Sequence, residues 1–191
     1  TAGWTGAIGG SGTVGGTNGH ERAEVIDDAG TIVFDGSFSR GNDVIVLDGA
    51  ASAWAVVRHS ASIALFSDGD TFVEVPVGAT GTAILFDDGA RTLAFTSAGA
   101  MTIGGQTIGT TLANIAAAPS PGSLPGGDDA GALARLFLAP GSETSAGGHL
   151  LVIGTNSAET LHLADGDILL DGSFTRGNDT LVFDFAASTF Q

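Results

Sequence analysis

The sequence predicts an all-β protein, either a β-sandwich or a short β-solenoid module accompanied by a partial second copy of itself. Three observations predict this fold class. Apolar residues alternate or run briefly between turn signals, with no sustained helical spacing. The turns are rich in Gly and Asp, and one block of the chain occurs twice. At 191 residues with 43% hydrophobic content, the chain is long enough to bury a core.

Short apolar segments recur about every ten residues through the first half of the chain, and each is bounded by Gly, Asp or Asn. This spacing suits a sandwich, a meander or a solenoid, and periodicity alone does not choose among them. We predict strands at Glu24–Ile26, Thr31–Phe34, Asp43–Leu47, Ala53–Arg58, Ser62–Phe66, Thr71–Val75, Thr82–Phe86, Thr92–Phe95 and Met101–Ile103.

Gly-containing and Asp-containing segments separate these strands, and such residues tolerate positive φ and close tight hairpins. Pro76 lacks an N–H, so it should lie at a sheet edge or a strand end. The predicted turns are residues 28–30, 40–42, 67–70, 77–79 and 87–89.

The duplicated block is the most specific feature of the chain. Residues 35–48 recur as residues 171–184 with four changes, all of which keep β-branched or apolar character. The match reaches outward to residues 16–18 against 154–156, and only the region before Asp35 needs a gap. A chain that uses one β-unit twice favours a surface or scaffold role over a compact enzyme.

The duplication divides the chain into three parts. Residues 1–112 form a first β-rich module, residues 113–148 a Pro/Gly/Ala-rich linker, and residues 149–191 a partial second copy. Within the linker, Asp128 and Asp129 precede Leu133, Leu136 and Phe137, which predicts at most one short helix. The second copy lacks counterparts of about five predicted strands, so it exposes β-edges unless another surface completes it.

Charge and composition narrow the function classes. The chain has 21 acidic residues against 6 Arg, no Lys and a formal charge of −15, so binding to nucleic acid is excluded on electrostatic grounds. It has no Cys and no apolar run of membrane-spanning length. This composition is typical of secreted bacterial surface proteins, and we expect an extracellular or cell-surface location.

Calcium is the cofactor that the acidic turns suggest, because it takes six to eight oxygen ligands from carboxylates and backbone carbonyls. A Gly-Asn-Asp turn also forms without metal, so a purely structural turn remains the alternative. The candidate ligands are Asp35, Asn42, Asp43, Asp48, Asp171, Asn178, Asp179 and Asp184, and the secondary candidates are Asp68, Asp70, Asp87 and Asp88.

Residues 41–46 and 177–182 resemble the second half of the RTX nonapeptide, although Phe38-Ser39 and Phe174-Thr175 replace its leading glycines. More broadly, residues 43–109 resemble a β-module that recurs in RTX-type, calcium-associated bacterial surface proteins. The resemblance rests on the order of residues 44–49, 73–78, 86–93 and 103–109. It implies secretion by a type I exporter, a role in an S-layer, adhesin or matrix, and no catalytic residues.

Catalytic motifs are weak or missing from the sequence. Residues 10–15 satisfy G-x-G-x-x-G, but no predicted strand precedes them and further glycines follow. There is no G-x-S-x-G, no H-E-x-x-H and no cysteine nucleophile. The chain is therefore not expected to be an enzyme, and a polymer hydrolase survives as an alternative only because acids are plentiful.

We expect a structural, self-associating surface protein that forms a homo-oligomer or polymer through β-edge pairing. The alternative is a calcium-stabilised carbohydrate-binding module of a larger secreted protein, with a surface glycan as its partner. Trp4 and Trp54 are the candidates for a sugar platform, although Trp54 lies in an alternating segment that favours the core.

Overall fold

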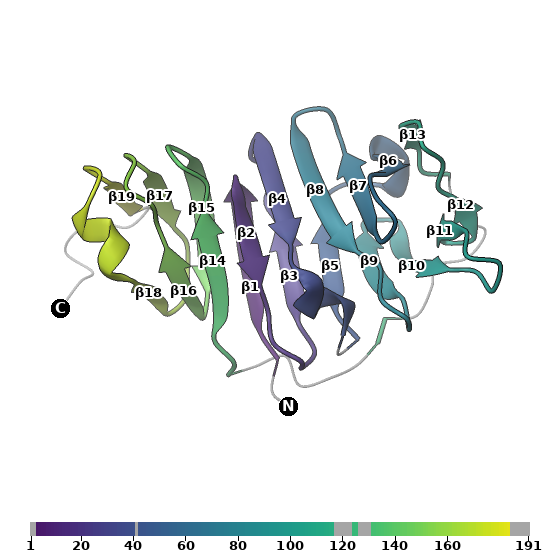
Figure 1. Ribbon diagram of the computed structural model, residues 1–191, viewed down its shortest axis with the longest axis horizontal. Helices are drawn as coiled ribbons and strands as arrows, with labels where there is room; N and C mark the ends of the chain where they lie inside the picture. Colours follow the sequence, from purple (N-terminus) through teal and green to yellow (C-terminus); the bar gives the residue numbers. More distant parts are fainter. Residues whose placement is uncertain (1–2, 41, 117–123, 126–130, 184–191) are drawn as a thin grey trace.

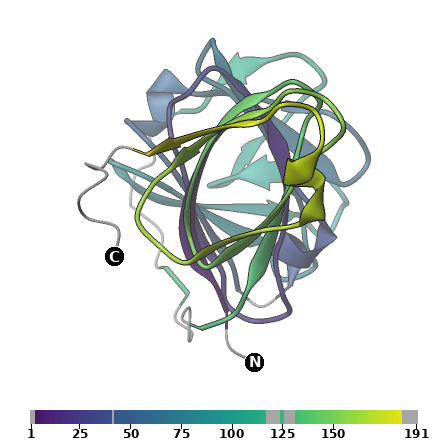
Figure 2. The same cartoon turned by 90° about the vertical axis from the view of Figure 1, so that its left-hand side faces the viewer.

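Two β-sheets face each other along the whole molecule and enclose a single apolar layer (Figures 1 and 2). The computed structural model describes residues 3–40, 42–116, 124–125 and 131–183. It is all-β, with 49% of residues in strands, and the strands stack as a β-solenoid of about eight turns. Of the two alternatives left by the sequence, the structure selects the solenoid.

Over residues 5–47 and 143–183, successive strands alternate between the two sheets, so that like strands of successive turns pair in parallel. Antiparallel hairpins within one sheet join the strands of residues 55–76 and, in the other sheet, those of residues 82–107. The first sheet, called sheet A, contains in spatial order β12 (Gln106–Thr107), β11 (Met101–Ile103), β10 (Gly89–Phe95), β9 (Thr82–Phe86), β5 (Val44–Leu47), β3 (Arg22–Val25), β1 (Thr5–Gly10), β15 (Glu143–Gly148), β17 (Thr160–Leu163) and β19 (Thr180–Phe183).

The opposite sheet, sheet B, contains β13 (Ala113–Asn114), β6 (Ala55–Arg58), β7 (Ile63–Ser67), β8 (Thr71–Pro76), β4 (Gly30–Phe34), β2 (Gly12–Gly15), β14 (Ala134–Leu138), β16 (Leu150–Ile153) and β18 (Ile168–Leu170). Three short 3₁₀ helices complete the described chain: η1 (Gly36–Ser39), η2 (Ala51–Ala53) and η3 (Gly172–Thr175).

Buried and exposed side chains alternate along the strands, and the buried ones form the core. In β8, Val73 and Val75 are fully buried, whereas the preceding residue, Phe72, is 37% exposed. Strands with this period of two place one set of side chains between the sheets and the other set outside. Among the largest fully buried side chains are Trp4, Phe38, Phe66, Ile8, Ile32, Ile45, Leu47, Ile84 and Leu93.

All nine predicted strands are present, with ends that shift by at most a few residues. Pro76 ends β8, as its missing N–H requires. Residues 67–70 and 87–89 close hairpins, as predicted. The predicted hairpin turns at 28–30, 40–42 and 77–79 are wrong as hairpins, because the strands on either side of each belong to different sheets: β3 and β4, β4 and β5, and β8 and β9. At 28–30 and 40–42, positive φ is used to turn a solenoid corner.

The predicted short helix before Pro140 is wrong. Residues 126–130 lie outside the described residues, and Ala134–Leu138 form strand β14. Ala134, Leu136 and Leu138 are buried while Arg135 and Phe137 are exposed, which is the period of a strand. An isolated five-residue apolar segment takes the geometry of its neighbours, and here β2 and β16 pair with it on both sides.

Strands β12, β13 and β15 were not predicted from the sequence, and neither were β1 and β2, whose glycines hide any alternation. Those glycines allow close approach: a Cβ on Gly6 would lie 2.2 Å from the Trp4 ring and 2.4 Å from the Gly147 carbonyl oxygen. The G-x-G-x-x-G motif at residues 10–15 therefore covers the last residue of β1, the connecting residue Ser11 and strand β2.

The two copies of the repeat meet head to head. Residues 16 and 154 are equivalent, with an offset of 138, and the same offset equates Ile8 with Ala146. Strands β1 and β15 pair antiparallel with Ile8 directly opposite Ala146. The two equivalent strands therefore pair with each other, and the equivalent residues Ile8 and Ala146 lie opposite one another. This pairing defines a pseudo-two-fold axis between β1 and β15, at what we call the β1–β15 joint.

Sheet B repeats this symmetry around one central strand. In the order β4-β2-β14-β16-β18, β2 corresponds to β16 and β4 to β18, so β14 occupies the middle. The first copy extends from the joint toward β13 and the second toward β19 (Figure 1). The Ala132 N–H donates a hydrogen bond to the Gly3 carbonyl oxygen at 3.0 Å. Each copy continues the solenoid away from the joint.

The stacking predicts different costs for truncating equivalent aromatic side chains. Phe38 is fully buried and its ring centroid lies 4.6 Å from that of Phe34, whereas Phe174 is only partly buried. We expect Phe38→Ala to lower the free energy of unfolding by about 3–5 kcal/mol, and Phe174→Ala by roughly half of that. Chemical denaturation of both variants measures the difference. Equal losses would contradict the assigned packing.

Candidate functional site

The repeated block builds the same polar corner in both copies. In the first copy, the Ser37 N–H donates to Asp35 Oδ1 at 2.8 Å, and the Gly16 N–H of the preceding turn donates to Ser37 Oγ at 2.7 Å. Asp35 is the N-cap of η1. The repeated Asp-Gly-Ser sequence therefore caps a 3₁₀ helix and ties it to the neighbouring turn of the solenoid.

The second copy reproduces these contacts. Asp171 caps η3 by accepting from the Ser173 N–H at 3.0 Å, and Ser173 Oγ accepts from the Gly154 N–H at 2.7 Å. Asn42 and Asn178 share a φ of 64°, the left-handed conformation that Asn tolerates better than most residues. Identical geometry from identical residues shows that the repeat encodes a corner of the fold.

A buried carboxyl pair lies beneath the first corner. The Glu21 N–H donates to Asp43 Oδ1 at 2.9 Å, and both side chains are at most 2% exposed. Glu21 Oε1 accepts from the backbone N–H and the hydroxyl of Thr17, but Glu21 Oε2 and Asp43 Oδ2 are buried without a hydrogen-bond partner. Burial raises the pKa of Asp43 to about 8, and contact with the Glu21 carboxyl adds to the effect.

The equivalent pair of the second copy has a different balance. The Glu159 N–H donates to Asp179 Oδ1 at 3.0 Å. Burial acts to raise the pKa of Glu159, but hydrogen bonds from Thr155 and Gly141 outweigh it and hold that pKa below its ordinary value. No described strand follows β19 in its sheet, whereas β9 follows β5. Asp43 of the first copy is thus more deeply buried than its equivalent Asp179 in the second.

Stability should therefore depend on pH through Asp43. Because the folded chain retains a proton that the unfolded chain releases, we expect the free energy of unfolding to fall between about pH 4 and pH 8, by at most about 1.4 kcal/mol per pH unit. Asp43→Asn should flatten this part of the profile, and exposed Asp87→Asn should not. Denaturation in chelator across this range tests it; matching profiles for wild type and Asp43→Asn would refute the assignment.

The remaining primary candidates do not gather around these pairs. The Asp48 backbone oxygen accepts from Trp54 Nε1 at 2.7 Å, and its side chain is exposed at the opposite end of β5 from Asp43. Asp184 lies outside the described residues. Within residues 3–40, 42–116, 124–125 and 131–183, no group of three or more His, Asp or Glu side chains lies close enough together to hold a metal ion through side chains alone.

The secondary candidates lie in turns with local partners. The Asp68 carboxylate accepts from the Thr71 N–H at 3.0 Å, and the Asp70 carbonyl accepts from the Gly30 N–H at 3.1 Å. Asp87 is exposed next to Asp88. These contacts account for a role in the hairpins at 67–70 and 87–89.

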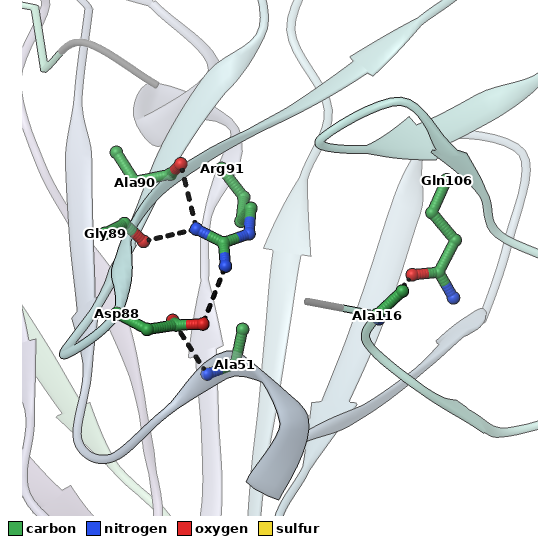
Figure 3. Close-up of polar contacts among 7 residues, drawn as sticks. All are labelled: Ala51, Asp88, Gly89, Ala90, Arg91, Gln106 and Ala116. Atoms are coloured by element: carbon green, nitrogen blue, oxygen red, sulfur yellow. Dashed lines mark hydrogen bonds and ion pairs between the residues drawn. The ribbon is translucent and has the colours of Figure 1, made fainter. Parts of the chain in front are cut away.

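Asp88 belongs to a small ionic anchor, shown in Figure 3. Its carboxylate lies 2.8 Å from Arg91 Nη2 and also accepts from the Ala51 N–H of η2 at 3.1 Å. The buried Arg91 guanidinium donates further to the carbonyl oxygens of Gly89 and Ala90. The hairpin between β9 and β10 is thereby tied to η2. Nearby, Gln106 accepts from the Ala116 N–H at 2.7 Å.

The tryptophans do not form a sugar platform. Trp4 is 0% and Trp54 2% exposed, which confirms Trp54 as core and places Trp4 there as well. Of the histidines, His20 Nδ1 lies 2.6 Å from the Asn42 carbonyl oxygen and His59 Nε2 3.8 Å from a Glu74 carboxylate oxygen. Each of these two rings thus has a local structural partner.

Sequence reasoning missed one polar pocket, which lies on the outer face of sheet A beside the β1–β15 joint. Its volume is about 280 Å³. The lining residues are Gly10, Asp28, Ala29, Glu143, Thr144, Ser145 and His162. They come from segments more than a hundred residues apart, so no local motif could have identified them.

Comparison with protein-family models, with curated proteins and with solved structures finds no match to this chain. In the described part of the chain, no helix is long and apolar enough to cross a membrane.

Proposed function

We propose that this protein is a structural, self-associating unit of an extracellular or bacterial cell-surface assembly, such as an S-layer, filament or adhesin. One observation carries the proposal: the solenoid turn formed by β18, η3 and β19 exposes apolar residues that its twin in the first copy buries. Turns of a solenoid bury their apolar residues against neighbouring turns, so this end is suited to receive another.

Leu181 on β19 is one residue whose exposure differs between the two copies. Its equivalent Ile45 is fully buried, because β9 pairs with β5 on the outer side, whereas Leu181 is 37% exposed. Leu169 on β18 is 52% exposed. The first copy thus shows what covers such a surface, namely another turn with a strand in parallel register.

A second copy of the chain is the occupant that we propose for this surface. The β1–β15 joint already joins two equivalent strands antiparallel, and β19 offers a sheet edge for the same kind of pairing. With a formal charge of −15, two chains repel each other over most of their surface, so contact is favoured where side chains are apolar.

Light scattering against concentration tests the assembly. We expect the wild-type protein to associate and Leu181→Lys to weaken association at least tenfold, because an ammonium group in this surface would lose its hydration. Leu112→Lys is the matched control, since it makes the same charge change at a residue that is 49% exposed near the other end. A wild type that stays monomeric, or equal effects of the two variants, would rule out this surface.

Calcium stabilisation is a further part of the proposal. Asp43 and Asp179 each keep one buried oxygen without a hydrogen-bond partner, and a proton or a cation must offset the charge there. Glu21 and Asp43 alone supply fewer oxygens than calcium usually takes, so backbone carbonyls or water would complete the shell.

Thermal unfolding in calcium and in chelator distinguishes a bound calcium ion from a proton at these carboxylates. If calcium occupies the corners, Asp43→Ala combined with Asp179→Ala lowers the melting temperature by several degrees in calcium and much less in chelator. The control is Asp70→Ala with Asp87→Ala, which removes the same charge at exposed turns. An equal loss in both buffers would show that the aspartates act only through the backbone.

The alternative function, a carbohydrate-binding module of a larger secreted protein, is favoured by the pocket at the β1–β15 joint. Binding of a glycan by a protein that remains monomeric would support it over assembly. The two functions are measured independently, because the pocket is lined by residues next to the β1–β15 joint, whereas Leu181 belongs to β19. The joint lies inside the sheet and β19 at its end (Figure 1).

A further inference from the structure

The pocket on sheet A is built from departures from the internal repeat. The offset of 138 pairs Ser145 with Ala7 and His162 with Glu24, so the pseudo-two-fold mate of this surface lacks the hydroxyl and the imidazole. The residues that form the corner hydrogen bonds are the same in both copies, whereas Ser145 and His162 differ from their equivalents. The fold therefore does not require the polar side chains of the pocket.

A two-residue insertion contributes the rest of the pocket. The first copy runs from Asp27 to Gly30 where the second runs directly from Asp165 to Gly166. Gly30 and Gly166 are structurally equivalent, since a Cβ on each would lie 2.3 Å from the carbonyl oxygen of an equivalent glycine, Gly10 or Gly148. The extra residues are Asp28 and Ala29, and both line the pocket.

Asp28 reaches across strand β1 to the second copy. Its Oδ2 accepts a hydrogen bond from Ser145 Oγ at 2.6 Å. A Cβ on Gly9 would lie 2.5 Å from the same oxygen, so the carboxylate occupies the space that the missing side chain leaves. The insertion thus places a carboxylate over the joint between the copies.

A second oriented carboxylate faces this pocket from β15. His162 Nε2 lies 2.8 Å from Glu143 Oε1, and Ser145 lies opposite His162 in the parallel pairing of β15 with β17. Ser145 and His162 thus hold the two carboxylates of the pocket, with no Lys or Arg in its lining. A carboxylate held by one donor retains lone pairs for further donors.

We propose that this pocket binds one uncharged pyranose ring of a glycan. A ring with several hydroxyl groups supplies the donors that the two carboxylates lack, while Ala29 and the Gly10 backbone provide apolar contact for its carbon atoms. The volume of about 280 Å³ suits a single ring. Uronic acids and sulfated sugars are repelled by the carboxylates and by the chain's net negative charge.

This site goes beyond self-association and does not depend on it, so binding is measured at a concentration where light scattering reports monomer. The probes are gluco-, manno- and galacto-oligosaccharides, with oligogalacturonate as the acidic counterpart, followed by saturation-transfer NMR. We expect saturation transfer to at least one neutral oligosaccharide and none to oligogalacturonate. Transfer to none of the neutral probes, or equal transfer to oligogalacturonate, would overturn the proposal.

Two variants test whether the sugar binds in this pocket. Glu143→Gln alters a side chain that is 75% exposed, and deletion of residues 28–29 gives the first copy the corner length of the second. Both should fold, as thermal unfolding would show, and each should weaken binding at least tenfold. Glu24→Gln is the control, because Glu24 is the pseudo-two-fold mate of His162 and is exposed. Binding unchanged in Glu143→Gln, or equally weakened in Glu24→Gln, would overturn the assignment.

Discussion

The structure depends on the contact between successive solenoid turns. A single turn contributes two or three inward side chains per strand and cannot bury them alone, so the core exists only where turns stack. The corner bonds set the register of that stacking: the Glu21 N–H to Asp43, and the Gly16 N–H to Ser37, each span one turn. Because these bonds involve backbone donors next to strands β2 and β3, they fix the strand pairing that aligns Ala23 with Ile45 in the core.

Local sequence was enough to predict the strands with β-branched and aromatic residues, because alternation survives in any half-buried strand. It was not enough for β1, β2 and β14, nor for β12, β13 and β15. The first two owe their conformation to close approach of neighbouring backbones, which glycine permits but does not signal, and β14 is a strand because two strands flank it. The turn residues 28–30 and 40–42 were identified correctly as turns, but sequence does not say which sheet the next strand joins.

The candidate ligands show the same division between local and distant information. Repetition correctly drew attention to Asp35, Asp43, Asp171 and Asp179, and the structure explains their recurrence by caps and by bonds between turns. The partner of Asp43, Glu21, lies one turn away and carried no signal of its own in the sequence analysis. The pocket is still less local, because Asp28 and Ser145 are separated by 117 positions and meet only at the head-to-head joint.

Internal duplication therefore separates the residues that the fold requires from those that it tolerates. Where the copies agree, as at Asn42 and Asn178 with the same φ, the fold explains the residue. Where they differ on equivalent backbone, the fold tolerates either choice, so a polar residue found in one copy needs another explanation. Ser145, His162 and the inserted Asp28 meet that criterion together in one pocket. The joint supplies the geometry, because head-to-head pairing brings the outer faces of the two copies onto one continuous sheet, and the pocket lies on one side of the pseudo-two-fold axis.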